Sequence, residues 1–115
     1  MRLIKAIVID SHPDVVHQLT KFAEENAVIL DICAFSDDLK ASIPLIQAHK
    51  PELLFIAPTA ANLASFDLIK GLNFNVPKFI FISEDTHKAY DAYRYGAVDF
   101  QKYPIDFNEL IISTY

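Results

Sequence analysis

Five short apolar runs, separated by segments of helical periodicity, constrain the fold of this chain more than any other feature. The runs are LIKAIVI at 3–9, VILDICAF at 28–35, LLFI at 53–56, KFIFIS at 78–83 and VDFQ at 98–101. The first, third and fourth have almost no polar residue in their interiors, which is typical of strands covered on both faces. We therefore expect a parallel sheet that lies between two layers of helices.

The segments between these runs carry helix signals. The first helix is expected to begin within 11–14, SHPD, where cap-type residues accompany a proline, and to reach about Asn26. A second helix should follow the cap-type residues of 36–38, and Pro44 within its apolar pattern predicts a short, kinked or irregular helix. Three further helices are expected at 66–72, from Asp85 or Thr86 to Tyr95, and at 107–114.

Strands that alternate with helices require right-handed crossover connections and one parallel sheet. With five strands, the best topology is a flavodoxin-like (βα)5 α/β fold, a three-layer sandwich whose five-stranded parallel sheet has the order 2-1-3-4-5. Ligands and chemistry in such a fold lie at the carboxyl ends of the strands. The loops in question are 10–12, 57–60 and 83–85.

Composition narrows the possible functions. The 115 residues fit one domain, 1–115, and 52% of them are hydrophobic, which argues against disorder. The net charge is −5 without a basic block, so this domain alone is not expected to hold nucleic acid. The apolar start is too short for a secretory core or a membrane span, and the single cysteine, Cys33, should be a buried structural thiol. A soluble, cytoplasmic domain without membrane contact is expected.

No catalytic or metal-binding pattern stands out. Two glycines cannot form a glycine-rich phosphate loop, and no Ser-His-Asp or Cys-His arrangement is evident. Two of the four histidines, His12 and His17, are five residues apart rather than the three or four that share a helix face. We therefore expect no metal, no cofactor and no enzymatic activity, and histidines that lie on the surface.

Three stretches together resemble the receiver domain of two-component response regulators, over essentially the whole chain. They are KAIVIDSHP at 5–13, KPELLFIAP at 50–58 and FIFISEDTHKAYDAYRYGAVDFQKYPIDFNEL at 79–110. The chain is most similar to the receivers that precede LytTR-type DNA-binding domains. The last expected helix, DFNELIISTY, stops at Tyr115 without a capping signal, so we expect the chain to be an N-terminal fragment of a longer regulator. The resemblance implies a LytTR-like domain after it, and DNA contact would come only through such a further domain.

The resemblance also implies the parts of a phosphorylation site. Family receivers accept a phosphoryl group on an aspartate after the third strand and hold Mg²⁺ with an acidic pair after the first. A hydroxyl after the fourth strand and a lysine before the proline of the fifth loop read the phosphoryl group. In this chain the acidic pair falls on Asp10 and Ser11, the acceptor on Ala57, the hydroxyl on Ser83 and the lysine on Tyr103.

Only Ser83 and one carboxylate of these parts are intact. Ala57 has no nucleophile, and Asp10 beside Ser11 is a poor cage for Mg²⁺, which prefers carboxylate oxygens in octahedral geometry. Without an acceptor there is no phosphoryl group for a metal or a lysine to contact. The changes at Ser11, Ala57 and Tyr103 are therefore consistent with one another. The sequence therefore predicts a degenerate pseudo-receiver that signals through protein contacts rather than phosphotransfer.

Two interpretations of Asp10 stay open. It is either a surviving functional acid or a structural carboxylate that accepts hydrogen bonds from backbone amides of the surrounding loops. If Tyr103 closes over the pocket, Asp10 would accept the hydroxyl of that residue. His12 would lie at the rim of the same pocket. The main alternative function is a flavodoxin-like binder of a small ligand or nucleotide, which would use the vacated cleft and which fails if Tyr103 and Phe100 fill it.

The resemblance places Phe100 on the aromatic switch position, where a ring is kept and the hydroxyl is lost, so Ser83 and Phe100 are the switch-like residues. A dimer and output face is implied for the fourth expected helix, and a homodimer or a protein partner is therefore expected. Its candidate residues are Tyr90, Tyr93, Arg94 and Tyr95. Tyr and Arg are enriched in interface cores, but half-buried rings that pack onto the sheet would give the same pattern.

Overall fold

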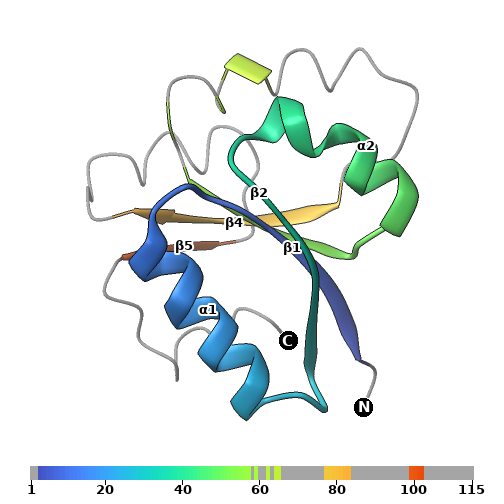
Figure 1. Cartoon of the computed structure of the whole chain (residues 1–115), viewed down its shortest axis with the longest axis vertical. Helices are drawn as coiled ribbons and strands as arrows, with labels where there is room; N and C mark the ends of the chain where they lie inside the picture. Colours follow the sequence, from blue (N-terminus) through green and yellow to red (C-terminus); the bar gives the residue numbers. More distant parts are fainter. Residues whose placement is uncertain are drawn as a thin grey trace.

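The computed structural model describes residues 3–57, 59, 62, 64–65, 77–83 and 99–102. These residues contain a five-stranded parallel sheet of order β2-β1-β3-β4-β5 (Figure 1). The strands are β1 (Ile4–Ile9), β2 (Leu30–Ser36), β3 (Leu53–Ile56), β4 (Lys78–Ser83) and β5 (Asp99–Lys102). The expected order is confirmed, and every strand begins and ends within two residues of its expected position.

Helix α1 (Pro13–Glu25) begins and ends at local capping contacts. Nδ1 of His12, the N-cap residue, accepts a hydrogen bond from the Asp14 backbone N–H at 3.2 Å. At the other end the Asn26 backbone N–H donates to the Phe22 carbonyl at 3.0 Å. The helix buries Val15, Leu19 and Phe22 against one face of the sheet, as its apolar spacing predicted.

Helix α2 (Leu39–His49) covers the other face of the sheet through Leu39 and Ile46. The Asp38 carboxylate caps its start by accepting from the Ala41 N–H at 2.7 Å. Pro44 lies inside this helix, which is continuous over its 11 residues, and a kink at the proline stays a prediction. The helix ends at Lys50, whose φ of 50° is the left-handed conformation of a C-terminal cap.

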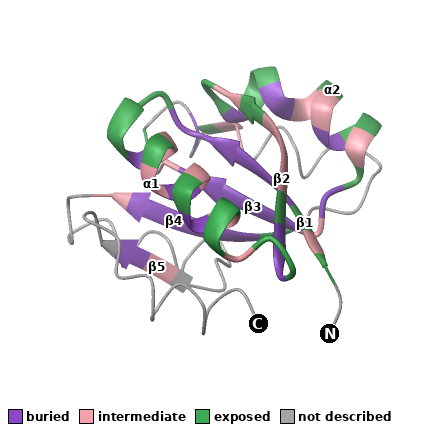
Figure 2. Cartoon of the chain, turned by 60° about the horizontal axis from the view of Figure 1, so that its bottom comes forward, coloured by how far each residue is buried: buried purple, intermediate pink, exposed green. Residues whose placement is uncertain are grey.

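The core forms two layers, one on each side of the sheet, because successive strand residues point to opposite faces. Figure 2 shows the buried central strands β1, β3 and β4 between α1 and α2. The layer under α1 contains Val8, Phe55 and Ile80, and the layer under α2 contains Ile9, Ile56 and Phe81. The helices expected at 66–72, 85–95 and 107–114 lie outside the described residues.

The edge strand β2 is built differently from the centre. Its register against β1 shifts by one residue, since Ala6 pairs with Ile32 and Ile7 pairs with Ala34. Cys33 is the extra residue of this bulge, and its thiol donates to the Ala6 carbonyl at 3.4 Å. The expectation of a buried thiol is wrong in degree: Cys33 is only half-buried, because it lies on the edge strand of the described sheet.

Candidate functional site

The carboxyl edge of the sheet brings Asp10 and Ala57 side by side. β1 and β3 are neighbours, with Ile9 paired to Ile56, and each candidate residue follows directly after its strand. The Ala57 backbone N–H donates to the Ile9 carbonyl at 3.0 Å, so the parallel ladder continues one step beyond both strands. This is the position that the fold predicts for ligands and chemistry.

Ala57 is half-buried, and its backbone N–H and carbonyl are both hydrogen-bonded. Its carbonyl oxygen accepts from the side-chain amide of Asn62 at 2.7 Å and from the Thr59 N–H at 2.9 Å. The side chain is a methyl group, which has no lone pair to attack phosphorus or to bind a cation. The strand end expected to carry the reactive group therefore carries none.

Asp10 is 9% exposed, and its Oδ1 accepts from the His12 backbone N–H at 2.8 Å. Its own N–H donates to the Ser36 carbonyl at 3.0 Å. Burial raises the pKa of the carboxyl group above its ordinary value, although the amide of His12 and the charge of that residue oppose the shift. The hydrogen bond to a loop amide that was expected of a structural carboxylate is present, whereas Tyr103, the other expected partner, lies outside the described residues.

These residues do not fit the Mg²⁺ ion that receivers hold. Ser11 is exposed and offers at most a hydroxyl, Ala57 offers no side-chain ligand, and one oxygen of Asp10 already accepts an amide hydrogen bond. Within the described part of the chain, no group of three histidine, cysteine or carboxylate side chains could hold a metal ion. The chemistry of the donors thus argues against a magnesium cage at this edge.

Ser83 and Phe100 come from neighbouring strands. Phe100 pairs with Phe81, and Ser83 pairs with Lys102 two residues further along the same two strands. Because side chains alternate along a strand, Ser83 and Phe100 belong to the face of the sheet that α2 covers, and Phe100 packs against the core there. Tyr103 and the candidate interface residues Tyr90, Tyr93, Arg94 and Tyr95 lie outside the described residues.

Asn62 is a site residue that sequence reasoning missed. Its side chain is 1% exposed and joins two elements: Oδ1 accepts from the Leu39 N–H at 2.8 Å, while Nδ2 donates to the Ala57 carbonyl. Its backbone N–H also donates to the Thr59 hydroxyl at 3.1 Å. Asn62 therefore ties the carboxyl end of β3 to the first turn of α2. The sequence PTAANLA gives no signal for this role, because the partner Leu39 is 23 residues away.

The hollow beside Asp10 lies between the end of β2 and the starts of α1 and α2. It has a volume of about 480 Å³ and is lined by Asp10, Ser11, Pro13, Val16, Phe35, Ser36, Asp37, Asp38 and Ala41. Three of these side chains are carboxylates and none is lysine, arginine or histidine. A nucleotide phosphate would meet like charge here, so this hollow gives no support to the nucleotide-binding alternative.

Searches with the sequence found no matching family model and no matching curated protein. The folded chain, in contrast, is similar to many solved structures. The receiver domain of NtrX from Brucella abortus superimposes with a TM-score of 0.74 at 22% identity, covering 93% of this chain and 92% of that one. The response regulator domain of Thermotoga maritima CheB gives 0.77 at 20% identity, with 98% and 94% coverage.

A two-component response regulator of the LuxR family from Aurantimonas gives a TM-score of 0.78 at 16% identity, covering 96% of this chain and 81% of that one. The chain has the receiver fold. The flavodoxin-like α/β prediction is thereby confirmed, with helices on both faces of a sheet of order 2-1-3-4-5. No helix in the described ranges of this receiver fold is long and apolar enough to cross a membrane.

Proposed function

We propose that this chain is an atypical receiver domain of a two-component response regulator, which signals through protein contacts without being phosphorylated. The receiver fold over nearly the whole chain supports the first half of this statement. A methyl group at the carboxyl end of β3 supports the second half, and it is the single observation that carries the proposal. The domain has no enzymatic role in this proposal, and no cofactor.

The chemistry of phosphoryl transfer explains why Ala57 is decisive. A lone pair on an acceptor oxygen must displace the leaving group at phosphorus, and bound Mg²⁺ normally offsets the charge that accumulates. Asp10, the carboxylate next to Ala57 along this edge, is buried and already accepts an amide hydrogen bond. A transfer to Asp10 would need that hydrogen bond to break and a metal cage that the neighbouring residues do not supply.

The loop after β3 takes a different role in this proposal. Asn62 holds it to α2 through two hydrogen bonds of 2.7 and 2.8 Å, in a place where almost no solvent reaches. Such a buried and satisfied amide favours one arrangement of the loop. A partner would then act by preferring one conformation of the domain, and it can shift the equilibrium only by its difference in affinity for the two states.

The partner in this proposal is another protein or a second copy of the chain. DNA would be contacted only by a further domain of a longer regulator, and the LytTR class is the one that the sequence motifs resemble most. The acidic net charge of −5 agrees with a domain that does not itself hold DNA.

The test is treatment with a small phosphodonor, acetyl phosphate, in the presence of Mg²⁺, followed by intact-mass spectrometry. We expect no gain of a phosphoryl mass. The matched control is the double variant Ser11→Asp/Ala57→Asp, which restores the acceptor and the second carboxylate and should acquire one phosphoryl group. An acyl-phosphate adduct on the native chain, at Asp10 or elsewhere, would contradict the proposal.

A further inference from the structure

The β2 edge of the sheet exposes large apolar side chains that the proposed site does not use. Phe35 on β2 is 49% exposed and Leu3, just before β1, is 47% exposed. Exposed aromatic rings beside a cavity are typical anchors of protein interfaces. Phe35 lines two hollows and is the one residue that their linings share.

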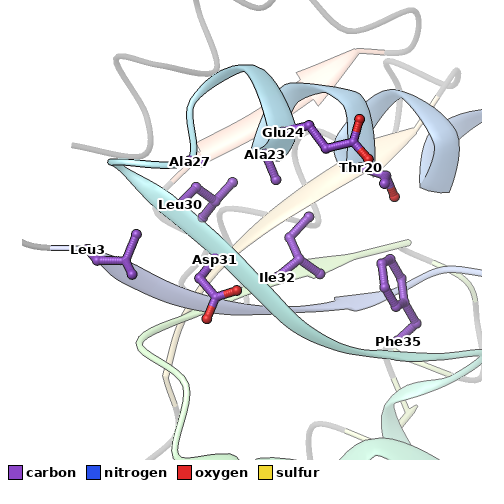
Figure 3. Close-up of a pocket in the computed structure, with 9 residues that line it drawn as sticks. All are labelled: Leu3, Thr20, Ala23, Glu24, Ala27, Leu30, Asp31, Ile32 and Phe35. Atoms are coloured by element: carbon purple, nitrogen blue, oxygen red, sulfur yellow. The ribbon is translucent and has the colours of Figure 1, made fainter.

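The first hollow lies between α1 and β2 and has a volume of about 410 Å³. Figure 3 shows Thr20, Ala23 and Glu24 along its helix side, and Leu30, Ile32 and Phe35 along its strand side. Ala23, with Ala27 just beyond the end of α1, leaves room there that larger side chains would fill. Leu3 and Asp31 complete the lining.

The second hollow is the one beside Asp10, and it continues the first across Phe35. The two together are called the α1–β2 groove here. The groove is lined by Leu3, Thr20, Ala23, Glu24, Ala27, Leu30, Asp31, Ile32 and Phe35 in its first part, and by Asp10, Ser11, Pro13, Val16, Phe35, Ser36, Asp37, Asp38 and Ala41 in its second. It therefore has an apolar centre and follows one side of α1.

The charged side chains that line the groove all have one sign. Its lining holds the carboxylates Glu24, Asp31, Asp10, Asp37 and Asp38, and no lysine, arginine or histidine. Asp10 and Asp38 accept backbone hydrogen bonds, but the other three make no ion pair within the described ranges. Lys5 is the register partner of Asp31, yet its Nζ donates to the His49 carbonyl at 3.4 Å.

We infer that the α1–β2 groove binds a basic amphipathic helix of a partner protein. Apolar side chains of the helix would pack on Phe35 and into the two hollows, while its lysines and arginines would face the carboxylates on the rim. This inference rests on the proposed function, because it supplies the contact surface that a domain signalling through protein contacts requires.

Two other occupants fit less well. A second copy of the chain in the groove would bring the same acidic rim against itself, which costs free energy through like-charge repulsion. An extended peptide added to the β2 edge would meet the bulge at Cys33, which interrupts the regular ladder that strand addition needs. Charge complementarity and the bulge therefore both favour a basic helix that lies in the groove.

The probe is a synthetic amphipathic helix with leucines on one face and lysines on the other, and its counterpart carries glutamates in place of the lysines. Binding to the whole chain is followed by fluorescence anisotropy at low salt, and the site is mapped by amide chemical shifts in ¹⁵N-labelled protein. We expect the basic helix to bind with shifts concentrated on the groove residues, and the acidic helix not to bind. No binding by the basic helix, or shifts centred elsewhere, would overturn the inference.

Two matched pairs of variants sharpen the test. Glu24→Lys reverses a rim charge, whereas Glu25→Lys reverses an exposed charge that does not line the groove. We expect Glu24→Lys to lower the affinity for the basic helix roughly fivefold more than Glu25→Lys does. Phe35→Ala should weaken it about tenfold, and Val28→Ala, which removes an apolar side chain that is 76% exposed outside the lining, should leave it unchanged.

Equal effects of the two substitutions within either pair would contradict the groove as the binding site. Sedimentation gives a second check: a dimer of the chain that Phe35→Ala dissociates, and that the basic helix does not dissociate, would also contradict it. Failure of the proposed function is read separately, in the mass after phosphodonor treatment. If the chain stays unmodified but does not bind the helix, the groove inference fails and the proposed function stands. If the chain becomes phosphorylated and binds the helix, the proposed function fails and the groove inference stands.

Discussion

The centre of the sheet and its β2 edge differ in burial and in the regularity of their strands. Every residue of β3 is at most 4% exposed, and its four side chains alternate between the core layers under α1 and α2. β2 has one buried residue, a bulge at Cys33 and a phenylalanine that is half in water. The comparison shows that stability is concentrated at the centre, whereas the edge keeps apolar surface available for contact.

The same contrast holds for the polar groups. Around Ala57 at the centre, the buried groups are paired: Asn62 satisfies the end of β3 and the start of α2 together. Around the edge, Glu24 and Asp31 are left without an ion pair in the described part of the chain. The described polar groups at the centre are therefore paired with one another, while the edge has carboxylates that a partner can engage.

The largest expected effect is on the free energy of unfolding, when a phenyl ring is removed from the centre of the sheet. Removal of the same ring from the edge is the comparison. Phe55→Ala empties a site that is 1% exposed and should lower the free energy of unfolding by about 3–5 kcal/mol. Phe35→Ala removes the same ring from a side chain that is 49% exposed and should cost less than about 1 kcal/mol. Urea denaturation followed by circular dichroism measures both.

Because the cost of Phe55→Ala is a large part of the stability of a small domain, Phe55→Leu serves as a milder variant that should stay folded. Its cost should still exceed that of Phe35→Ala. If the edge substitution proved as costly as either central one, Phe35 would be a core residue and the comparison would fail.

The next effect tests the link between β3 and α2. Asn62→Ala leaves the Leu39 N–H and the Ala57 carbonyl without their buried side-chain partner, so it should lower the free energy of unfolding by about 1–3 kcal/mol. Asn26→Ala is the control, because the Asn26 side chain also donates to a carbonyl, that of Phe22, but at a half-buried helix end.

The control should cost less than about 1 kcal/mol. Hydrogen exchange of the Leu39 amide provides a local readout, which should accelerate in Asn62→Ala and not in Asn26→Ala. Unchanged exchange at Leu39 would show that the hydrogen bond from its N–H to Asn62 does not hold the start of α2.

The central strands were predictable because their sequences are short, apolar runs that fit a strand buried on both faces. The runs LLFI and KFIFIS are apolar throughout their interiors, and both strands have the predicted bounds. The edge strand was placed two residues too early, since Val28 and Ile29 look like strand residues. They lie instead in a turn in which the Asn26 carbonyl accepts from Ile29 and Leu30, and this turn chemistry overrides their β propensity.

The residues of the candidate site also differ in whether the sequence could predict their positions. The positions of Asp10 and Ala57 follow from strand ends and topology, both of which the sequence specifies. Asn62 and the α1–β2 groove could not be predicted, because each depends on which surfaces meet in space. An asparagine after two alanines carries no sign of a partner 23 residues earlier, and the space that Ala23 and Ala27 leave near Leu30 exists only once α1 has packed on β2.

The smallest expected effect concerns the charge of Asp10, which lies between the two regions and lines the groove. Burial raises its pKa above the ordinary value of 3.8, so the folded chain binds the proton more tightly than the unfolded chain does. The stabilising contribution of the protonated form is complete below pH 3.8 and is lost as the pH rises through the higher pKa of the folded state.

Asp10→Asn keeps an oxygen that can accept from the His12 N–H and removes the titration. In urea denaturation across this acidic range, the native chain should therefore lose stability relative to Asp10→Asn as the pH increases. Parallel curves would mean that the carboxylate is as well solvated as in the unfolded chain. In that case Asp10 would belong to the open edge, and the rigid centre would begin at Ala57.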